Sequence, residues 1–236
     1  MDAFIREEML LGADAMERLR QSHVMVFGIG GVGSYAAEGL ARAGIGKLTL
    51  IDNDTVSETN LNRQLCALRS TVGRSKAEVM AERISDINPD CLVRAIPRLY
   101  SEESKELFFS EPCDYIIDAI DLVSCKLSLI LNARERGIPI ISAMGTGNKL
   151  DPTQFEITDI SKTQGCHLAR IMRKELRNRG VLHHTVLYSR EEPQKAETGE
   201  EPPPGRRSIP GSVSWVPSCA GLMMAGHVVQ ALIGRI

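Results

Sequence analysis

The chain has 236 residues, of which 43% are hydrophobic and 25% are charged. This balance is typical of a soluble globular protein and excludes an intrinsically disordered or collagen-like chain. Lys and Arg number 28 against 30 Asp and Glu, a net charge of −2, so any surface that binds nucleic acid must be a local patch.

The first two thirds of the chain alternate short apolar runs with amphipathic segments. Residues 1–22 have apolar side chains at helical spacing and predict a helix. The apolar runs predict strands over 23–27, 47–51, 92–96, 115–119 and 138–143. The segments between them predict helices over 34–43, 76–88, 102–109 and 126–136. Such alternation predicts an α/β fold: a Rossmann-like, doubly wound and mainly parallel sheet with helices on both faces.

The pattern changes after Gly147. Strands are predicted over 155–160 and 185–189, with a basic helix over 166–179 between them. Residues 191–205 are charged and rich in proline, which predicts a mobile loop. Residues 213–233 are apolar but include Pro217, and we expect a buried strand-turn-helix here and not a membrane span. We expect one domain, with a nucleotide-binding core over 1–150 and an extension of mixed strands and a basic helix over 151–236.

A glycine-rich loop joins the first strand to the helix that follows it. Its glycines are Gly28, Gly30, Gly31 and Gly33, which permit a tight turn and let backbone N–H groups approach phosphates. Asp52 ends the second strand 19 residues after Gly33, where a carboxylate accepts hydrogen bonds from ribose hydroxyls. These features predict a nucleotide site and, taken alone, are typical of NAD.

The residues that follow Asp52 favour a triphosphate over NAD. Asn60, Arg63 and Gln64 form a polar cluster, and Arg guanidinium groups match phosphate oxygens. Lys76 begins the next helix, and Asp121 lies in an Asp-Ala-Ile-Asp run at the end of a strand. A carboxylate in that place can hold Mg²⁺ that bridges phosphate oxygens. These residues therefore predict a nucleoside triphosphate together with Mg²⁺.

Four motifs, GIGGVGS, LIDNDTVSETNLNRQ, GRSKAEVMAERISDINP and IDAID, occur in this order. Over about residues 6–150 the chain resembles the adenylating core of the ThiF/MoeB/HesA superfamily, relatives of ubiquitin-activating enzymes. The resemblance implies that the glycines contact phosphates, Asp52 binds ribose, and Asn60, Arg63 and Gln64 line the triphosphate. It also implies catalytic roles for Arg63, Lys76 and Asp121, with Mg²⁺ on Asp121. Such enzymes form homodimers, and Arg6 is a candidate for the arginine that reaches the partner's ATP.

The late segments DPTQFEITDISKT and PGSVSWVPSCAGLMMAG extend the resemblance almost end to end, toward the tRNA threonylcarbamoyladenosine dehydratases. That group implies an ATP-dependent cyclisation of the modified adenosine through an acyl-adenylate, in the cytoplasm. Residues 161–190 contain seven Lys and Arg against one Glu, a local charge of +6 that suits RNA phosphates. The predicted tRNA contacts are Arg170, Arg173, Lys174 and Arg177.

Two other functions share parts of this pattern. The first is adenylation of the C-terminal glycine of a ubiquitin-like sulfur carrier, although the two C-x-x-C pairs usual in such enzymes are missing. The second is a non-catalytic NAD-binding module, which would leave Arg63 and Asp121 without a role. Six cysteines without a C-x-x-C pair predict free thiols in a reducing compartment. Cys66 and Cys125 are expected near the nucleotide and Cys219 in the core; a catalytic cysteine and a sulfur-transfer partner stay open.

Overall fold

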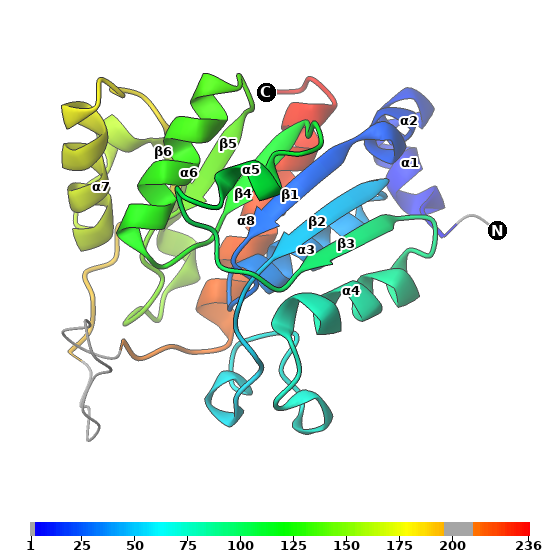
Figure 1. Cartoon of the computed structure of the whole chain (residues 1–236), viewed down its shortest axis with the longest axis horizontal. Coiled ribbons are helices and arrows are strands. Elements are labelled where there is room, and N and C mark those ends of the chain that lie inside the picture. Colours follow the sequence, from blue (N-terminus) through cyan, green and yellow to red (C-terminus); the bar gives the residue numbers. More distant parts are fainter. Residues whose placement is uncertain (1–2, 196–209) are drawn as a thin grey trace.

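The computed structural model describes residues 3–195 and 210–236, and within them one seven-stranded sheet forms the centre of the molecule (Figure 1). The strands are β1 (His23–Phe27), β2 (Lys47–Ile51), β3 (Leu92–Ile96), β4 (Tyr115–Asp118), β5 (Ile140–Ala143), β6 (Phe155–Asp159) and β7 (Thr185–Ser189). They lie in the order β3-β2-β1-β4-β5-β7-β6. Every neighbouring pair is parallel except β6 and β7. The predicted mainly parallel sheet is confirmed.

Helices cover both faces of the sheet (Figure 1). They are α1 (Ile5–Leu11), α2 (Ala13–Gln21), α3 (Gly33–Arg42), α4 (Lys76–Ile87), α5 (Lys105–Phe108), α6 (Val123–Glu135), α7 (His167–Asn178) and α8 (Trp215–Leu232). Short 3₁₀ turns are η1 (Glu58–Asn60), η2 (Arg69–Thr71), η3 (Pro152–Gln154) and η4 (Ile160–Lys162). Alternate residues of β1 point to opposite cores: Val24 and Val26 pack with α3 and α8, whereas Met25 and Phe27 pack with α5 and α6.

Nearly all of the segment 213–233 lies in the single helix α8 (Trp215–Leu232), so the predicted strand-turn-helix is wrong. Pro217 is the third residue of the helix, where its missing N–H would have no intrahelical partner in any case. A Cβ added at Gly221 would lie 2.3 Å from the carbonyl oxygen of Val32, because α8 crosses α3 at close range. An apolar segment without a clear period fits either a strand or a helix buried on most sides, and the contact with α3 selects the helix.

Among the other elements, the helices predicted over 1–22 and 102–109 differ most from the structure. The N-terminal helix is divided at Gly12, whose φ of +90° lies outside the helical region, so α1 and α2 are separate. The helix predicted over 102–109 is only Lys105–Phe108, because Ser101 to Ser104 form a turn in which the Ser104 hydroxyl accepts the N–H of Ser101.

Most of the loop predicted to be mobile, residues 191–205, lies outside the described residues. Its described beginning is fixed to the loop that follows β5. Glu191 is buried, and its carboxylate accepts the backbone N–H groups of Leu150 and Asp151 at 2.9 and 3.0 Å. No helix in the described part of the chain is long and apolar enough to cross a membrane.

Candidate active site

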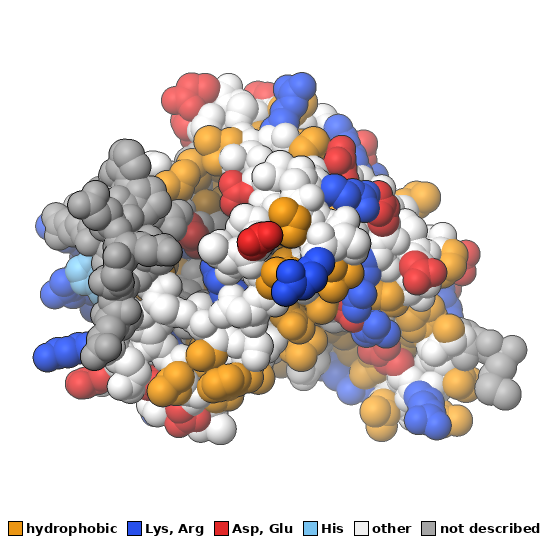
Figure 2. Space-filling view, turned by 90° about the horizontal axis from the view of Figure 1, so that it is seen from below, with side chains coloured by type: hydrophobic (Ala, Val, Ile, Leu, Met, Phe, Trp, Pro, Cys, Tyr) orange, Lys and Arg blue, Asp and Glu red, His pale blue; other side chains and the backbone are white. Residues whose placement is uncertain are grey.

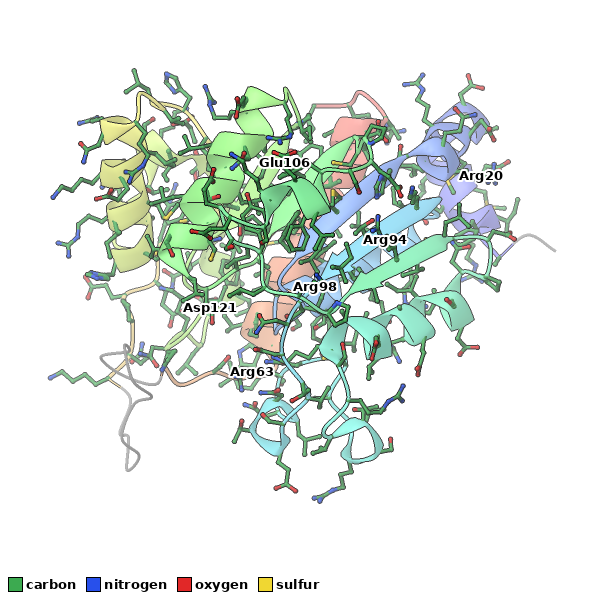
Figure 3. All side chains as sticks on the ribbon, viewed as in Figure 1. Arg20, Arg63, Arg94, Arg98, Glu106 and Asp121 are labelled. Atoms are coloured by element: carbon green, nitrogen blue, oxygen red, sulfur yellow. The ribbon has the colours of Figure 1, made fainter. Side chains whose placement is uncertain are left out.

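The carboxyl ends of the parallel strands meet at one edge of the sheet. Phe27, the last residue of β1, is in register with Ile51 of β2 and Asp118 of β4. The glycine loop, Asp52 and the Asp118–Asp121 turn therefore emerge side by side. Figure 3 shows Arg63 and Asp121 at this edge, which is the lower one in that view. Ligands of open α/β sheets bind here, where the chain leaves neighbouring strands in opposite directions.

Two glycines of the loop are required by close contacts. Gly28 has φ of +89°, and an added Cβ would lie 2.6 Å from the carbonyl oxygen of Ala119. At Gly33 an added Cβ would lie 1.7 Å from the carbonyl oxygen of Gly28, so the loop folds tightly onto the start of α3. Gly30 has no such neighbour: the nearest atom to its added Cβ is the Gln64 amide nitrogen at 3.9 Å. The loop thus packs against the sheet on one side and leaves backbone accessible on the side of Gln64.

Asp52 connects the loops that follow β1 and β2. One carboxylate oxygen accepts the N–H of Ile29 at 2.6 Å, and the other accepts the N–H of Asp54 at 2.7 Å. Burial raises the pKa of Asp52 above its usual value, against the lowering effect of these two hydrogen bonds. Each oxygen has a second lone pair, so the carboxylate can still accept hydrogen bonds from a ribose.

The predicted polar cluster lies beside the glycine loop. Asn60 is buried and accepts the N–H of Ser57 at 3.1 Å, which closes the η1 turn. Arg63 is half-buried, and its side chain passes 3.6 Å from the place of a Cβ on Gly31. Gln64 is buried, and its carbonyl oxygen Oε1 has no hydrogen-bond partner. A buried oxygen without a partner is costly. The residues therefore fit a polar ligand held between the glycine loop and Gln64.

Lys76 is buried at the first position of α4, and its ammonium group lies 2.8 Å from a carboxylate oxygen of Asp54. A cation at a helix N-terminus opposes the helix dipole, so this lysine requires a neighbouring anion. Asp54 supplies that anion in the structure, and its side chain is 60% exposed. A phosphate group that approaches from the solvent can bind Lys76 in the same way.

The two aspartates of the Asp-Ala-Ile-Asp run have different environments. Asp118 is fully buried and pairs with Lys126 of α6, whereas Asp121 is exposed at the edge of the sheet. Asp121 is a predicted site residue, whereas Lys126 has no role predicted from the sequence. The only signal for Lys126 is its place near the start of a predicted helix, eight residues after Asp118. Among the described residues, no group of three or more His, Cys, Asp or Glu side chains lies close enough to hold a metal ion.

The two cysteines expected near the nucleotide, Cys66 and Cys125, are buried thiols. Cys66 lies under the glycine loop, with its sulfur 3.8 Å from the carbonyl oxygen of Ile29, and burial raises its pKa to about 11. Cys125 is also buried, and burial raises its pKa. Both thiols are therefore protonated at neutral pH and are poor nucleophiles. Cys219 is partly exposed on α8, unlike the buried core residue that we expected.

The basic helix α7 lies at the other end of the sheet from β3 (Figure 1). Its apolar side chains Ala169, Met172 and Leu176 are buried. Arg170, Lys174 and Arg177 are exposed, and Figure 2 shows blue Lys and Arg side chains at this end of the lower face.

Arg173 differs from its three basic neighbours. Its guanidinium donates to the carbonyl oxygen of Thr163 at 2.8 Å and to its hydroxyl at 2.6 Å. Arg173 is half-buried and fastens α7 to the residue that follows the η4 turn.

Comparison with known proteins places the whole chain in one family. The model of the ThiF family matches residues 5–236. The chain belongs to the ThiF family. A tRNA threonylcarbamoyladenosine dehydratase of Bacillus subtilis is 46% identical to this chain over an alignment of 242 residues including gaps. The alignment covers 99% of this chain and 95% of the relative.

Solved structures agree with this membership of the ThiF family. The tRNA N6-threonylcarbamoyladenosine dehydratase of Escherichia coli in complex with AMP superposes with a TM-score of 0.89 at 37% identity, over 98% of this chain and 94% of that one. The same Escherichia coli protein in complex with ATP gives a TM-score of 0.88 at 38% identity, with the same coverage. The predicted fold class and superfamily are confirmed.

Proposed function

We propose that the protein dehydrates N6-threonylcarbamoyladenosine in tRNA, with ATP as the activating substrate. One observation carries the proposal: the glycine loop, Asp52, Gln64 and Lys76 lie at the carboxyl edge of the sheet in a chain that matches dehydratases over nearly its whole length. A similarity limited to the nucleotide core would fit any adenylating enzyme. Here the similarity also includes the part of the chain after residue 150.

The ATP would lie along the carboxyl edge of the sheet in the order of the strands. Asp52, after β2, binds the ribose, and the glycine loop after β1 binds phosphates at the N-terminus of α3. Lys76 exchanges its contact with Asp54 for a phosphate oxygen, and Arg63 adds a second cation. These groups neutralise the charge that develops as pyrophosphate leaves, so their contribution is positioning and electrostatic stabilisation.

Asp121 is the residue that would hold Mg²⁺. A single carboxylate suits this ion, because Mg²⁺ takes most of its remaining oxygen ligands from phosphates and water. Bound there, the ion would add positive charge beside the phosphate chain. Asp121 is exposed at the end of the turn that touches the glycine loop through Ala119 and Gly28, and this supports its assignment as the Mg²⁺ ligand.

The reaction needs activation because a carboxylate is a poor electrophile. The threonine carboxylate of the modified adenosine attacks the α-phosphorus of ATP, and pyrophosphate leaves. The carbamoyl group then attacks the acyl carbon, loses a proton and closes the ring as AMP leaves. The carboxylate oxygen that departs stays on AMP, so the nucleoside loses the elements of water. Because ring closure is intramolecular, no cysteine nucleophile is required.

The tRNA would contact the exposed face of α7. Arg170, Lys174 and Arg177 point to solvent from a helix that is fixed to the sheet by its apolar side. Phosphate contacts of this kind position an RNA without reading its sequence. Arg173 supports the same surface from beneath, because it already binds Thr163.

We infer that the protein acts as a homodimer in the cytoplasm, where its tRNA substrate is found. Met9 and Leu10 of α1 are 76% and 80% exposed, and Leu222 of α8 is 51% exposed. Apolar side chains of this size on a surface favour contact with another protein. Arg6 lies on α1 beside Met9 and Leu10, which suits donation to a partner's nucleotide. A sulfur-transfer partner stays a prediction.

The test is a single incubation of threonylcarbamoylated tRNA, labelled with ¹⁸O in the threonine carboxylate, with enzyme and Mg-ATP. We expect mass spectrometry to find a nucleoside lighter by the mass of one ¹⁸O-containing water and AMP that carries one ¹⁸O. An unchanged nucleoside, with ATP consumed only when a ubiquitin-like carrier protein is added, would instead support carrier adenylation. Unlabelled AMP beside a dehydrated nucleoside would contradict the acyl-adenylate.

A further inference from the structure

An ion pair is buried directly beneath the candidate active site. Asp118 ends β4 and Lys126 lies near the start of α6, and both side chains are completely inaccessible to solvent. Their carboxylate oxygen and ammonium nitrogen are 2.7 Å apart. A buried pair adds little net stability compared with apolar side chains of the same size, because both charges lose their hydration. Lys126 also lies near a helix N-terminus, where the dipole disfavours a cation.

The second oxygen of Asp118 is bonded to the turn that leads to Asp121. Its Oδ1 atom accepts the N–H of Ile120 at 3.1 Å, while Oδ2 accepts from Lys126. The residue between them, Ala119, donates its N–H to Phe27 at 2.8 Å, and its carbonyl oxygen lies against Gly28. One carboxylate thus links α6, the Asp121 turn and, through Ala119, the glycine loop.

The neighbouring strand offers no second anion to Lys126. Ser142 of β5 is in register with Asp118, and its hydroxyl lies 2.8 Å from Nε2 of His184. Burial first, and then the charge of Lys126, lowers the pKa of His184 to about 3, so this ring is neutral at physiological pH. Lys126 therefore directs its charge to Asp118, and this fixes which oxygen of Asp118 remains for Ile120.

We propose that Lys126 and Asp118 are positioning residues that hold the Ala119–Asp121 turn in the geometry needed to bind Mg-ATP. The ammonium group orients the Asp118 carboxylate, the carboxylate fixes the turn, and the turn presents Asp121 at the sheet edge. This inference rests on the proposed role of Asp121 and adds two residues that do not touch the nucleotide themselves.

The decisive experiment compares two double variants that both remove the buried charges. D118N/K126M keeps an oxygen that can accept the N–H of Ile120, whereas D118L/K126M has none. The readout is the affinity for ATP with and without Mg²⁺, measured by isothermal titration calorimetry. In wild type, Mg²⁺ should increase the affinity for ATP by a certain factor. We expect this factor to be at least tenfold smaller in D118L/K126M than in wild type, and to be reduced less in D118N/K126M. Equal affinities for the two variants, or the full wild-type gain in D118L/K126M, would overturn the proposal.

A second comparison applies if the leucine variant fails to fold. Lys126→Met alone should lower kcat at least tenfold and leave KM for tRNA within twofold of wild type. Leu129→Ala serves as the control, because it removes buried apolar volume from the same helix and leaves the Lys126–Asp118 pair in place. It should lower Tm and leave kcat within twofold below Tm. Equal kcat for these two variants would reduce Lys126 to a structural role.

The two proposals fail in distinguishable ways. If the wild-type enzyme does not dehydrate tRNA, the proposed function fails, and the calorimetric comparison of the double variants still tests the positioning role.

Discussion

The carboxyl edge of the sheet, where we propose that the nucleotide binds (the nucleotide edge), and the basic helix α7 differ in how far their polar residues are exposed to solvent. At the nucleotide edge Asn60, Gln64 and Lys76 are buried, and Asp52 uses both oxygens to hold backbone N–H groups. On α7 the cations Arg170, Lys174 and Arg177 are exposed to solvent. A small charged ligand is bound tightly when donors are fixed in advance, because little entropy is then lost on binding. A large polyanion instead needs charges spread over an accessible surface, where water and ions are released easily.

Because the groups at the nucleotide edge are fixed in place, we expect a substitution there to lower turnover more than a substitution on α7 does. Asp121→Ala should reduce turnover by about two to three orders of magnitude, the usual cost of removing one group that stabilises the transition state. The exposed position of Asp121 leads us to expect an unchanged Tm. Steady-state kinetics and a thermal melt on the same preparation check this. A turnover near wild type would move the Mg²⁺ site elsewhere.

Changes on α7 should act more gradually and depend on salt. Replacing Arg170, Lys174 and Arg177 together by Gln should raise KM for tRNA about tenfold or more and leave KM for ATP unchanged. The slope of log affinity against log salt should fall by about 2 to 3, near 0.7–0.9 per lost phosphate contact. Arg173→Gln is the contrasting variant: it should lower Tm, because its bonds to Thr163 are lost. An unchanged salt slope in the triple variant would place the tRNA surface elsewhere.

Thiol labelling tests whether a reagent can reach Cys66 beneath the glycine loop. Because burial raises the pKa of Cys66 to about 11, only about one molecule in a thousand carries the thiolate at pH 8. Iodoacetamide should therefore label the partly exposed Cys219 first and leave Cys66 unmodified in the native protein, as read by peptide mass spectrometry. Labelling of Cys66 before Cys219 would indicate that the glycine loop opens readily.

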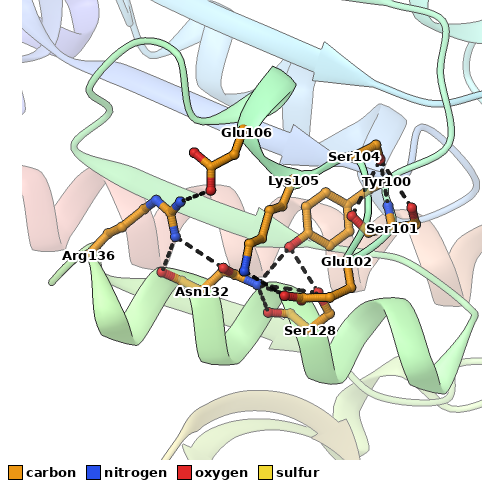
Figure 4. A network of polar contacts seen from close by, with 9 residues as sticks. All are labelled: Tyr100, Ser101, Glu102, Ser104, Lys105, Glu106, Ser128, Asn132 and Arg136. Carbon is orange, nitrogen blue, oxygen red and sulfur yellow. Dashed lines mark hydrogen bonds and ion pairs between the residues drawn. The ribbon is translucent and has the colours of Figure 1, made fainter.

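The smallest expected effect lies away from both regions, in the network of Figure 4. Glu102 accepts hydrogen bonds from Lys105 and Ser128, and these lower the pKa of Glu102 from 4.5 to about 2. Because the pKa of Glu102 is lower in the folded state, its ionised carboxylate stabilises the fold at pH values above about 4.5. This stabilisation is lost as pH falls from about 4.5 to 2. Glu102→Gln should make the free energy of unfolding less dependent on pH in that window, as denaturant titrations would measure. The same pH dependence in wild type and variant would contradict the network. The effect is small because Glu102 is exposed and screened.

The residues that we propose for the nucleotide site could be selected from the sequence because their signals are local. Gly28 and Gly33 lie too close to backbone atoms to carry a side chain. Asp52 directly follows a strand, and Lys76 begins a helix. Each of these features can be recognised from the few residues around it. Strand alternation determined the parallel sheet in the same way.

Other features were decided only by contacts between segments far apart in the chain. The packing of Gly221 on Val32 selected one helix over residues 215–232. Arg173 is half-buried because it binds Thr163 after η4, whereas its basic neighbours are exposed. Lys126 pairs with Asp118 because α6 packs over β4, which the sequence pattern does not indicate. Local patterns determine backbone conformation and periodicity, whereas the partner of a buried charge depends on which element packs above it, and only the tertiary structure fixes that.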